Sequence, residues 1–295
     1  MFSRILVPLD GSSLAELALP YAEELAEAFD SEITLIDVTE PEESEYLRMH
    51  QLYIEEMADR VRSHMKMGTG VKVKPVSTVG EPAQEIIDYA EENNISLITM
   101  TTHARSGIMP WTMGSIANKV LQRISMSVLL IRAKTPDLKV SKGSMFNKIL
   151  IALDGSETSE AVLPYARELA EKLRSEVVLL QVVTPGQHTH TIGGLDYITF
   201  TDQQIESMKA QSRQYLEKKS KELTGITATI KCEVKTGDAA REIIKFAEET
   251  NTRLVAVSAH GRSGIKQWIL GSVSHKIIQA GNTPTLLVKA PGVKK

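Results

Sequence analysis

The chain lacks several features that would point to a specialised environment. It has 295 residues but a single cysteine, Cys232, which excludes an intramolecular disulfide framework and suits the reducing cytosol. Cys232 lies in an alternating polar and apolar run, which predicts a strand residue rather than a nucleophile or redox sensor. No apolar run approaches the roughly 18 residues of a membrane span, and residues 1–10 lack the features of a signal peptide. We therefore expect a cytoplasmic protein with no membrane partner.

An excess of basic residues is also missing, and so are two common phosphate-binding motifs. The formal net charge is −3, so we expect no nucleic-acid partner. The sequence G-x-x-x-x-G-K-[ST] does not occur, which excludes a P-loop. The first expected strand is followed by Asp-Gly-Ser and not by G-x-G-x-x-G, which argues against a nicotinamide-binding Rossmann domain.

The chain does contain its own sequence twice. Residues 1–12, MFSRILVPLDGS, correspond to residues 145–156, MFNKILIALDGS, and Met145 follows Met1 by 144 residues. Gly237 follows Gly80 by 157 residues, so the second half holds 13 extra residues, which we place in the stretch 186–194. We predict an N-terminal domain over residues 1–134, a polar linker over residues 135–144 and a C-terminal domain over residues 145–295.

Short apolar runs alternate with segments of helical periodicity within each half. In the first half we expect strands at residues 4–9, 32–38, 71–76, 96–101 and 127–132, and helices at residues 14–29, 44–67, 81–93 and 115–123. This alternation predicts parallel βαβ units with right-handed crossovers. Each half is therefore expected to be a doubly wound α/β domain, with a five-stranded parallel sheet and helices on both faces.

Two loops in equivalent places have the composition of a phosphate site. Residues 258–272 read SAHGRSGIKQWILGS, between an apolar strand and a helix, and residues 101–115 read TTHARSGIMPWTMGS. Ligands of doubly wound sheets bind beyond the carboxyl ends of the strands, where the strand order reverses. Asp10 and Asp154 end the first strands at that edge, where a carboxylate can accept hydrogen bonds from a ribose or help hold Mg²⁺.

The loop at residues 258–272 is better equipped than its counterpart to bind an anion. Gly261 lets the backbone approach a phosphate, and Arg262 adds a charged donor. The helix start at residues 271–274 offers free N–H groups and two hydroxyls. Each feature also has a structural explanation, since Asp-Gly-Ser at residues 154–156 fits an N-cap and glycines are common at helix starts.

With these loops and the Leu-Asp-Gly-Ser that ends the first strand in both halves, the chain resembles the universal stress protein family in its tandem form. The family's nucleotide-binding members carry G-x-x-G, nine residues, and then G-S or G-T. Residues 258–272 match at every position except the first, where serine replaces glycine, whereas residues 101–115 lose both early glycines. The resemblance covers nearly the whole chain and implies the adenine-nucleotide α-hydrolase-like fold.

The resemblance implies that ATP, with or without Mg²⁺ near Asp154, is the cofactor and binds mainly in the C-terminal domain. The residues implied to contact adenosine are Ala152, Leu153, Asp154, Val182, Val257 and Ser258. Those implied to contact phosphates are His260, Gly261, Gly271, Ser272, Val273 and Ser274, with Arg262 beside them. The matching, weaker set in the N-terminal domain is Pro8, Leu9, Asp10, Val38, Met100, Thr101, His103, Ala104, Gly114, Ser115, Ile116 and Ala117.

Three functions stay open on the sequence alone. The first is a stress-response or regulatory protein whose conformation or partner affinity changes with ATP. The second is a protein-interaction module that keeps the fold without using nucleotide. The third is a weak ATP hydrolase, although no nucleophile, base and acid can be assembled and we therefore expect no catalytic residue and at most slow hydrolysis.

The last strand of each half is expected to join the two domains. Residues 128–132 and 285–289 are candidate edge strands, and single-domain relatives pair through this strand. The resemblance therefore implies an intramolecular pseudo-dimer, and leaves open a further homodimer. His188 and His190 have no cysteine or carboxylate pattern beside them, so we expect a solvated loop there and no metal site formed by the protein alone.

Overall fold

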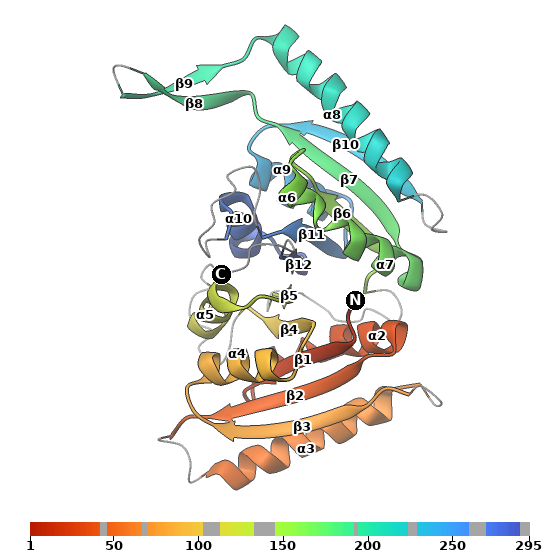
Figure 1. Cartoon of the computed structure of the whole chain (residues 1–295), viewed down its shortest axis with the longest axis vertical. Coiled ribbons are helices and arrows are strands. Elements are labelled where there is room, and N and C mark those ends of the chain that lie inside the picture. Colours follow the sequence, from red (N-terminus) through yellow and green to blue (C-terminus); the bar gives the residue numbers. More distant parts are fainter. Residues whose placement is uncertain are drawn as a thin grey trace.

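The chain forms one continuous ten-stranded sheet with helices on both faces in the computed structural model (Figure 1). The structure describes residues 1–41, 46–66, 70–102, 113–132, 145–191, 194–223, 229–259 and 270–289, leaving out the side chains of residues 187–198. Within the described part of the chain, no helix is both long and apolar enough to cross a membrane.

Strands and helices alternate in the N-terminal domain, as predicted. They are β1 (Arg4–Leu9), α1 (Ser13–Glu16), α2 (Leu19–Phe29), β2 (Glu32–Thr39), α3 (Leu47–His64), β3 (Val73–Val79), α4 (Pro82–Glu92), β4 (Leu97–Thr101), α5 (Ser115–Arg123) and β5 (Ser127–Ile131). All neighbouring strands of this domain are parallel, in the order β3-β2-β1-β4-β5.

The C-terminal domain repeats this order and adds a hairpin. Its elements are β6 (Lys148–Ala152), α6 (Glu157–Glu160), α7 (Leu163–Leu173), β7 (Glu176–Val183), β8 (Gly186–Thr191), β9 (Gly194–Thr199), α8 (Asp202–Glu222), β10 (Ile230–Thr236), α9 (Ala239–Glu249), β11 (Leu254–Ser258), α10 (Ser272–Ala280) and β12 (Thr285–Val288). Five of its strands are parallel in the order β10-β7-β6-β11-β12.

One helix predicted over residues 14–29 is in fact two. The short helix α1 ends at Glu16, and α2 starts at Leu19 with a proline in its first turn. Pro20 has no N–H to donate, and its ring would clash with the preceding turn of a continuous helix. Pro164 occupies the same place in α7, so the break recurs in the C-terminal domain.

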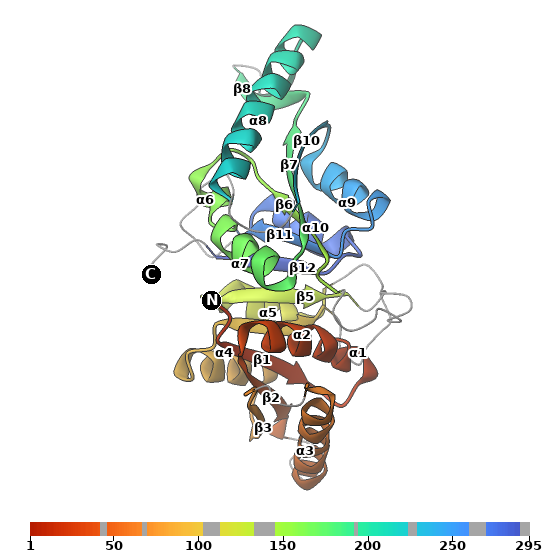
Figure 2. The same cartoon turned by 90° about the vertical axis from the view of Figure 1, so that its right-hand side faces the viewer.

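The loop expected in the inserted stretch is also wrong, because β8 and β9 pair there as an antiparallel hairpin. Threonine, isoleucine and tyrosine favour a pleated strand, and a Gly-Gly pair in the sequence between two such runs is typical of a hairpin. The backbone N–H of Phe200 donates to the carbonyl of Pro185 at 2.9 Å and closes the base of the hairpin. The hairpin and α8 lie at the end of the C-terminal domain farthest from the N-terminal domain (Figures 1 and 2).

The two domains join along β5 and β12, as predicted. These strands are antiparallel, with Leu129 opposite Leu286, and they make the two five-stranded sheets one. The guanidinium of Arg132 adds a bond across this seam, 2.7 Å from the carbonyl oxygen of Gly281. Two domains therefore pack together within one chain.

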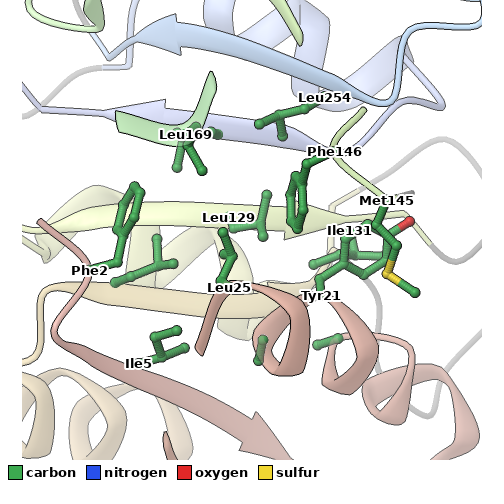
Figure 3. Close-up of a cluster of buried hydrophobic side chains, with 14 of the residues drawn as sticks. Phe2, Ile5, Tyr21, Leu25, Leu129, Ile131, Met145, Phe146, Leu169 and Leu254 are labelled. Atoms are coloured by element: carbon green, nitrogen blue, oxygen red, sulfur yellow. The ribbon is translucent and has the colours of Figure 1, made fainter. Parts of the chain in front are cut away.

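Each face of the sheet carries a core that runs across the seam. One core is built from α2, α3, α7 and α8, and the other from α4, α5, α9 and α10. In the first core, Phe2 packs against Tyr165 with ring centroids 5.8 Å apart. Phe146 packs against Tyr21 at the same centroid distance (Figure 3). The phenylalanine of each domain thus contacts the tyrosine of the other, which is the reciprocity of a two-fold interface.

Candidate functional site

The strand order reverses at one point in each domain, and the predicted site residues lie there. In the C-terminal domain β6 lies between β7 and β11 and is parallel to both. The carboxyl ends of these three strands therefore lie at the same edge of the sheet. The N-terminal domain has the same arrangement, with β1 between β2 and β4. Each of these edges carries a cavity.

The cavity of the C-terminal domain has a volume of about 300 Å³. Every described residue predicted for this site lines it, namely Ala152, Leu153, Asp154, Val182, Val257, Ser258, Gly271, Ser272, Val273 and Ser274. The sequence did not point to five further lining residues, Ser159, Leu180, Thr184, Ala239 and Ile243. Leu180 lies two residues before Val182 on a strand, so the alternation of β7 could have found it.

Asp154 is held in the cavity wall by the turn that follows β6. Its Oδ1 accepts hydrogen bonds from the backbone N–H of Ser156 at 2.9 Å and from the Ser156 hydroxyl. The Ser156 hydroxyl in turn accepts from the N–H of Ser159 and caps α6. The cap is therefore Ser156, and Asp154 orients it. Gly155 makes the turn possible with a φ of 85°, which disfavours a side chain.

The helix α10 presents its N-terminus to the same cavity. Its N-cap, Gly271, gives no side-chain hydrogen bond to the first turn, whereas α6 and α9 both have a side-chain cap. Among the described residues, no side chain caps the first N–H groups of α10, and a helix start of this kind suits an anion, next to the Ser272 hydroxyl. The Ser274 hydroxyl instead donates to the carbonyl of Ser258 at 2.8 Å and fastens α10 to the end of β11.

A lysine that sequence reasoning missed lies at this edge. Lys289 follows Val288, which pairs with Ser258 across β11 and β12. Burial lowers the pKa of the Lys289 amine to about 8, because a charged amine is poorly solvated there. An anion bound nearby would favour its charged form.

The cavity of the N-terminal domain is smaller, with a volume of about 130 Å³. Every described residue predicted for it lines it, namely Pro8, Leu9, Asp10, Val38, Met100, Thr101, Gly114, Ser115, Ile116 and Ala117. Ala15, Ile36, Pro82, Ile86 and Thr102 complete the wall and were not predicted. Asp10 is held as Asp154 is, with Oδ1 3.0 Å from the backbone nitrogen of Ser12.

Comparison with known proteins agrees with the repeat. The model of the family described as "Universal stress protein family" matches residues 1–132 and 145–289. This chain belongs to the universal stress protein family.

Members of the universal stress protein family resemble the chain either as half or as the whole of it. Universal stress protein YxiE of Bacillus subtilis is 32% identical over 148 residues, which are 49% of this chain and 100% of the relative. A universal stress protein of Mycolicibacterium smegmatis is 23% identical and covers 97% of this chain and 96% of its own length.

Solved structures match the whole tandem fold. A universal stress protein from Archaeoglobus fulgidus covers 98% of this chain and 99% of its own, with 20% identity and a TM-score of 0.69. A protein described as functionally unknown from Pseudomonas aeruginosa covers 99% of this chain and 94% of its own, with 16% identity and a TM-score of 0.73. These likenesses show that the ten-stranded arrangement is a universal stress protein fold.

Some predicted site residues lie outside the described residues. They are His103 and Ala104 in the N-terminal domain and His260, Gly261 and Arg262 in the C-terminal domain. The structure therefore describes the floor of each cavity and the helix start beside it. Across the described ranges, no group of three or more His, Cys, Asp or Glu is placed to hold a metal ion.

Proposed function

We propose that the C-terminal domain binds ATP or another adenine nucleotide, and that the protein acts as a nucleotide-dependent regulatory protein of the stress response. Membership of the universal stress protein family supports this, because nucleotide binding is widespread in it. The observation that carries the proposal is one cavity that holds both Asp154 and the uncapped N-terminus of α10. A carboxylate suits ribose hydroxyls, and a helix N-terminus suits phosphate.

The size and polarity of the cavity fit such a ligand. Its volume of about 300 Å³ reaches the lower end of the range for small-molecule sites, roughly 300 to 1,000 Å³. Its apolar part, including Leu180, Val182 and Ile243, suits a flat base, and the Ser272 hydroxyl at the start of α10 suits a phosphate. Mg²⁺ would enter with the nucleotide, near Asp154, since the described protein groups do not form a metal cluster themselves.

The proposal is tested by titrating the purified protein with ATP and measuring the heat of binding. We expect one ATP per chain, and we expect Asp154→Ala to weaken binding at least about tenfold, since two charge-assisted hydrogen bonds to a ligand are lost. Asp10→Ala is the matched control, because Asp10 occupies the same turn of the other domain. Equal ATP affinity of Asp154→Ala and the wild type would refute this site.

The smaller N-terminal cavity favours a second role for that domain. A volume of about 130 Å³ is below the usual range for ligand sites, which argues against a nucleotide in this domain. We propose that it serves protein interaction while the C-terminal domain senses nucleotide. Mass analysis of small molecules carried through native purification separates this from two nucleotide sites, since it counts the nucleotides bound per chain.

A further inference from the structure

Beside the cavity of the C-terminal domain, two side chains of the long helix α8 bind the last residue of the short helix α6, Glu160. The hydroxyl of Tyr215 donates to Glu160 Oε1 at 3.0 Å, and the amine of Lys219 lies 2.7 Å from Glu160 Oε2. The side chains of Lys219 and Glu160 are only 13% and 25% exposed, so solvent screens this pair less than a surface ion pair. Two residues of α8 thus hold both carboxylate oxygens of Glu160.

The residue before Glu160 reaches the cavity. Ser159 is buried, lines the cavity, and its hydroxyl donates to the carbonyl of Ser156 at 2.8 Å. The same Ser159 oxygen accepts from the backbone N–H of Asp154 at 3.3 Å. One turn of α6 therefore carries Glu160 toward α8 and Ser159 toward Asp154.

The electrostatics of Tyr215 reflect the same neighbourhood. Burial raises the pKa of the Tyr215 hydroxyl, and the hydrogen bond and charge of Glu160 raise it further. The Ser159 hydroxyl lowers that pKa and the Asp154 carboxylate raises it, so both act on Tyr215. Its bond to Glu160 raises the pKa of the Lys219 amine. The α8 side chains and the cavity carboxylate belong to one polar cluster.

The N-terminal domain has the equivalent contacts between α3 and α1, but no hydroxyl at the position of Ser159. Tyr53 and Arg60 of α3 contact Glu16, at 3.4 Å and 2.8 Å. The residue before Glu16 is Ala15, which has no hydroxyl to accept from the backbone of Asp10. Asp10 also raises the pKa of Tyr53, as Asp154 raises that of Tyr215, and Arg60 takes the place of Lys219. What this part of the N-terminal domain lacks is the hydroxyl oxygen at the position of Ser159.

We propose that Tyr215, Lys219 and Glu160 are positioning residues for the nucleotide site, and that they act on Asp154 through Ser159. The inference rests on the proposed nucleotide binding and adds how that site is held and what it controls. By reciprocity, a ligand that needs this position of Asp154 stabilises the contact of α8 with α6. Because α8 follows the β8–β9 hairpin and Thr184 lines the cavity just before it, nucleotide binding is then linked to both ends of this insertion.

The test compares ATP affinity among variants of the full chain. We expect Tyr215→Phe and Ser159→Ala to weaken ATP binding roughly three- to tenfold, as the loss of one hydrogen bond does. In the Ser159→Ala background, Tyr215→Phe is expected to have no further effect, because its route to Asp154 is already removed. Ser159→Thr, which keeps the hydroxyl, is expected to bind as the wild type does.

Tyr53→Phe is the matched control, because it removes the same hydroxyl in the domain whose link is absent. It should leave ATP affinity unchanged, with a similar change in thermal unfolding to that of Tyr215→Phe. A second readout is amide hydrogen exchange of α8, which ATP should slow in the wild type and not in Ser159→Ala.

The outcomes separate the two proposals. If the wild type does not bind ATP, the proposed function is refuted, and this inference with it. If the wild type binds and Tyr215→Phe binds equally well, or if the two substitutions add independently, only the positioning role is refuted. A loss of affinity in Ser159→Thr as large as in Ser159→Ala would show a steric role for Ser159 and overturn the link through its oxygen.

Discussion

The two cavities arise from equivalent residues of a repeated sequence, yet one has about 300 Å³ and the other about 130 Å³. The turn after the first strand is the same in both, with an aspartate whose Oδ1 accepts from the backbone N–H of the serine two residues later. The side chains that face the cavities differ. The turn is therefore kept for the fold, and Asp-Gly-Ser alone does not predict a ligand.

Two of the differences place a bulkier residue in the wall of the smaller cavity. Met100 lines the N-terminal cavity where Val257 lines the C-terminal one, and methionine has the longer side chain. Pro82 likewise replaces Ala239 at the start of the helix beyond the cavity. A third difference affects fastening, since Ala117 lacks the hydroxyl that joins α10 to β11 in the other domain. Volume and polarity both favour the C-terminal cavity for nucleotide.

The largest effect should come from breaking the reciprocal aromatic contacts that hold the two domains together. Phe2 and Phe146 are each 1% exposed, so truncation to alanine leaves a cavity and should cost about 3 to 5 kcal/mol of unfolding free energy. Phe2 contacts both Phe29 and Tyr165, so Phe2→Ala should lie at the upper end. Chemical denaturation measures both variants. A cost below about 1 kcal/mol for either would show that the domains are stable without this contact.

The next largest effect concerns a lining position at which the two cavities differ, Val257 in one and Met100 in the other. Val257→Met copies the N-terminal domain, and the extra volume should weaken ATP binding by about 1 to 3 kcal/mol, through overpacking of the base region. Met100→Val is the reverse change in the other domain and should leave the affinity of the C-terminal site unchanged. Titration of both variants with ATP measures this. Unchanged affinity in Val257→Met would place the base elsewhere.

Most of the fold follows from the sequence because local signals and the repeat agree. The bounds of β1 and α5 are those predicted, since a short apolar run ends at Leu9 and a glycine precedes the helix that starts at Ser115. Periodicity did not predict the helix break near Pro20, because the apolar face continues from α1 into α2. The β8–β9 hairpin was missed because the inserted stretch was judged by its histidines, as a metal site or a solvated loop, and not by its strand-forming residues.

The sequence predicted most of the residues that line the two cavities, but not the volumes of the cavities. Residues at strand ends, such as Asp154 and Val182, follow from topology, which brings the carboxyl ends together. Ser159 was missed because its role depends on the turn geometry around Asp154, which no periodicity encodes. The difference in cavity volume could not be predicted either, since it depends on how side chains such as Met100 pack in three dimensions.

The smallest effect distinguishes the helix caps beside the two cavities. Glu81 caps α4 and Asp238 caps α9, and the pKa of each carboxyl is lowered in the folded protein. The main cause for Glu81 is the hydrogen bond from Lys119, and for Asp238 the backbone N–H of Arg241. Because the folded state holds both groups ionised, the unfolded state binds more protons in acid, and stability falls as the pH drops through the folded pKa.

At pH values above the ordinary pKa of each carboxyl, both caps should therefore stabilise the folded state. We expect about a few tenths of a kcal/mol from each at these exposed positions. Glu81→Gln and Asp238→Asn remove the charge and should flatten the acid limb of the stability curve, measured by denaturation at a series of pH values. Salt provides the contrast between the domains. It should reduce the contribution of Glu81, which depends on the exposed amine of Lys119, more than that of Asp238, whose main partner is a fixed backbone donor. Asp238 also forms an ion pair with the amine of Lys276, at 3.4 Å. Equal salt sensitivity of the two contributions would mean that the ion pairs, and not the backbone bond, determine both.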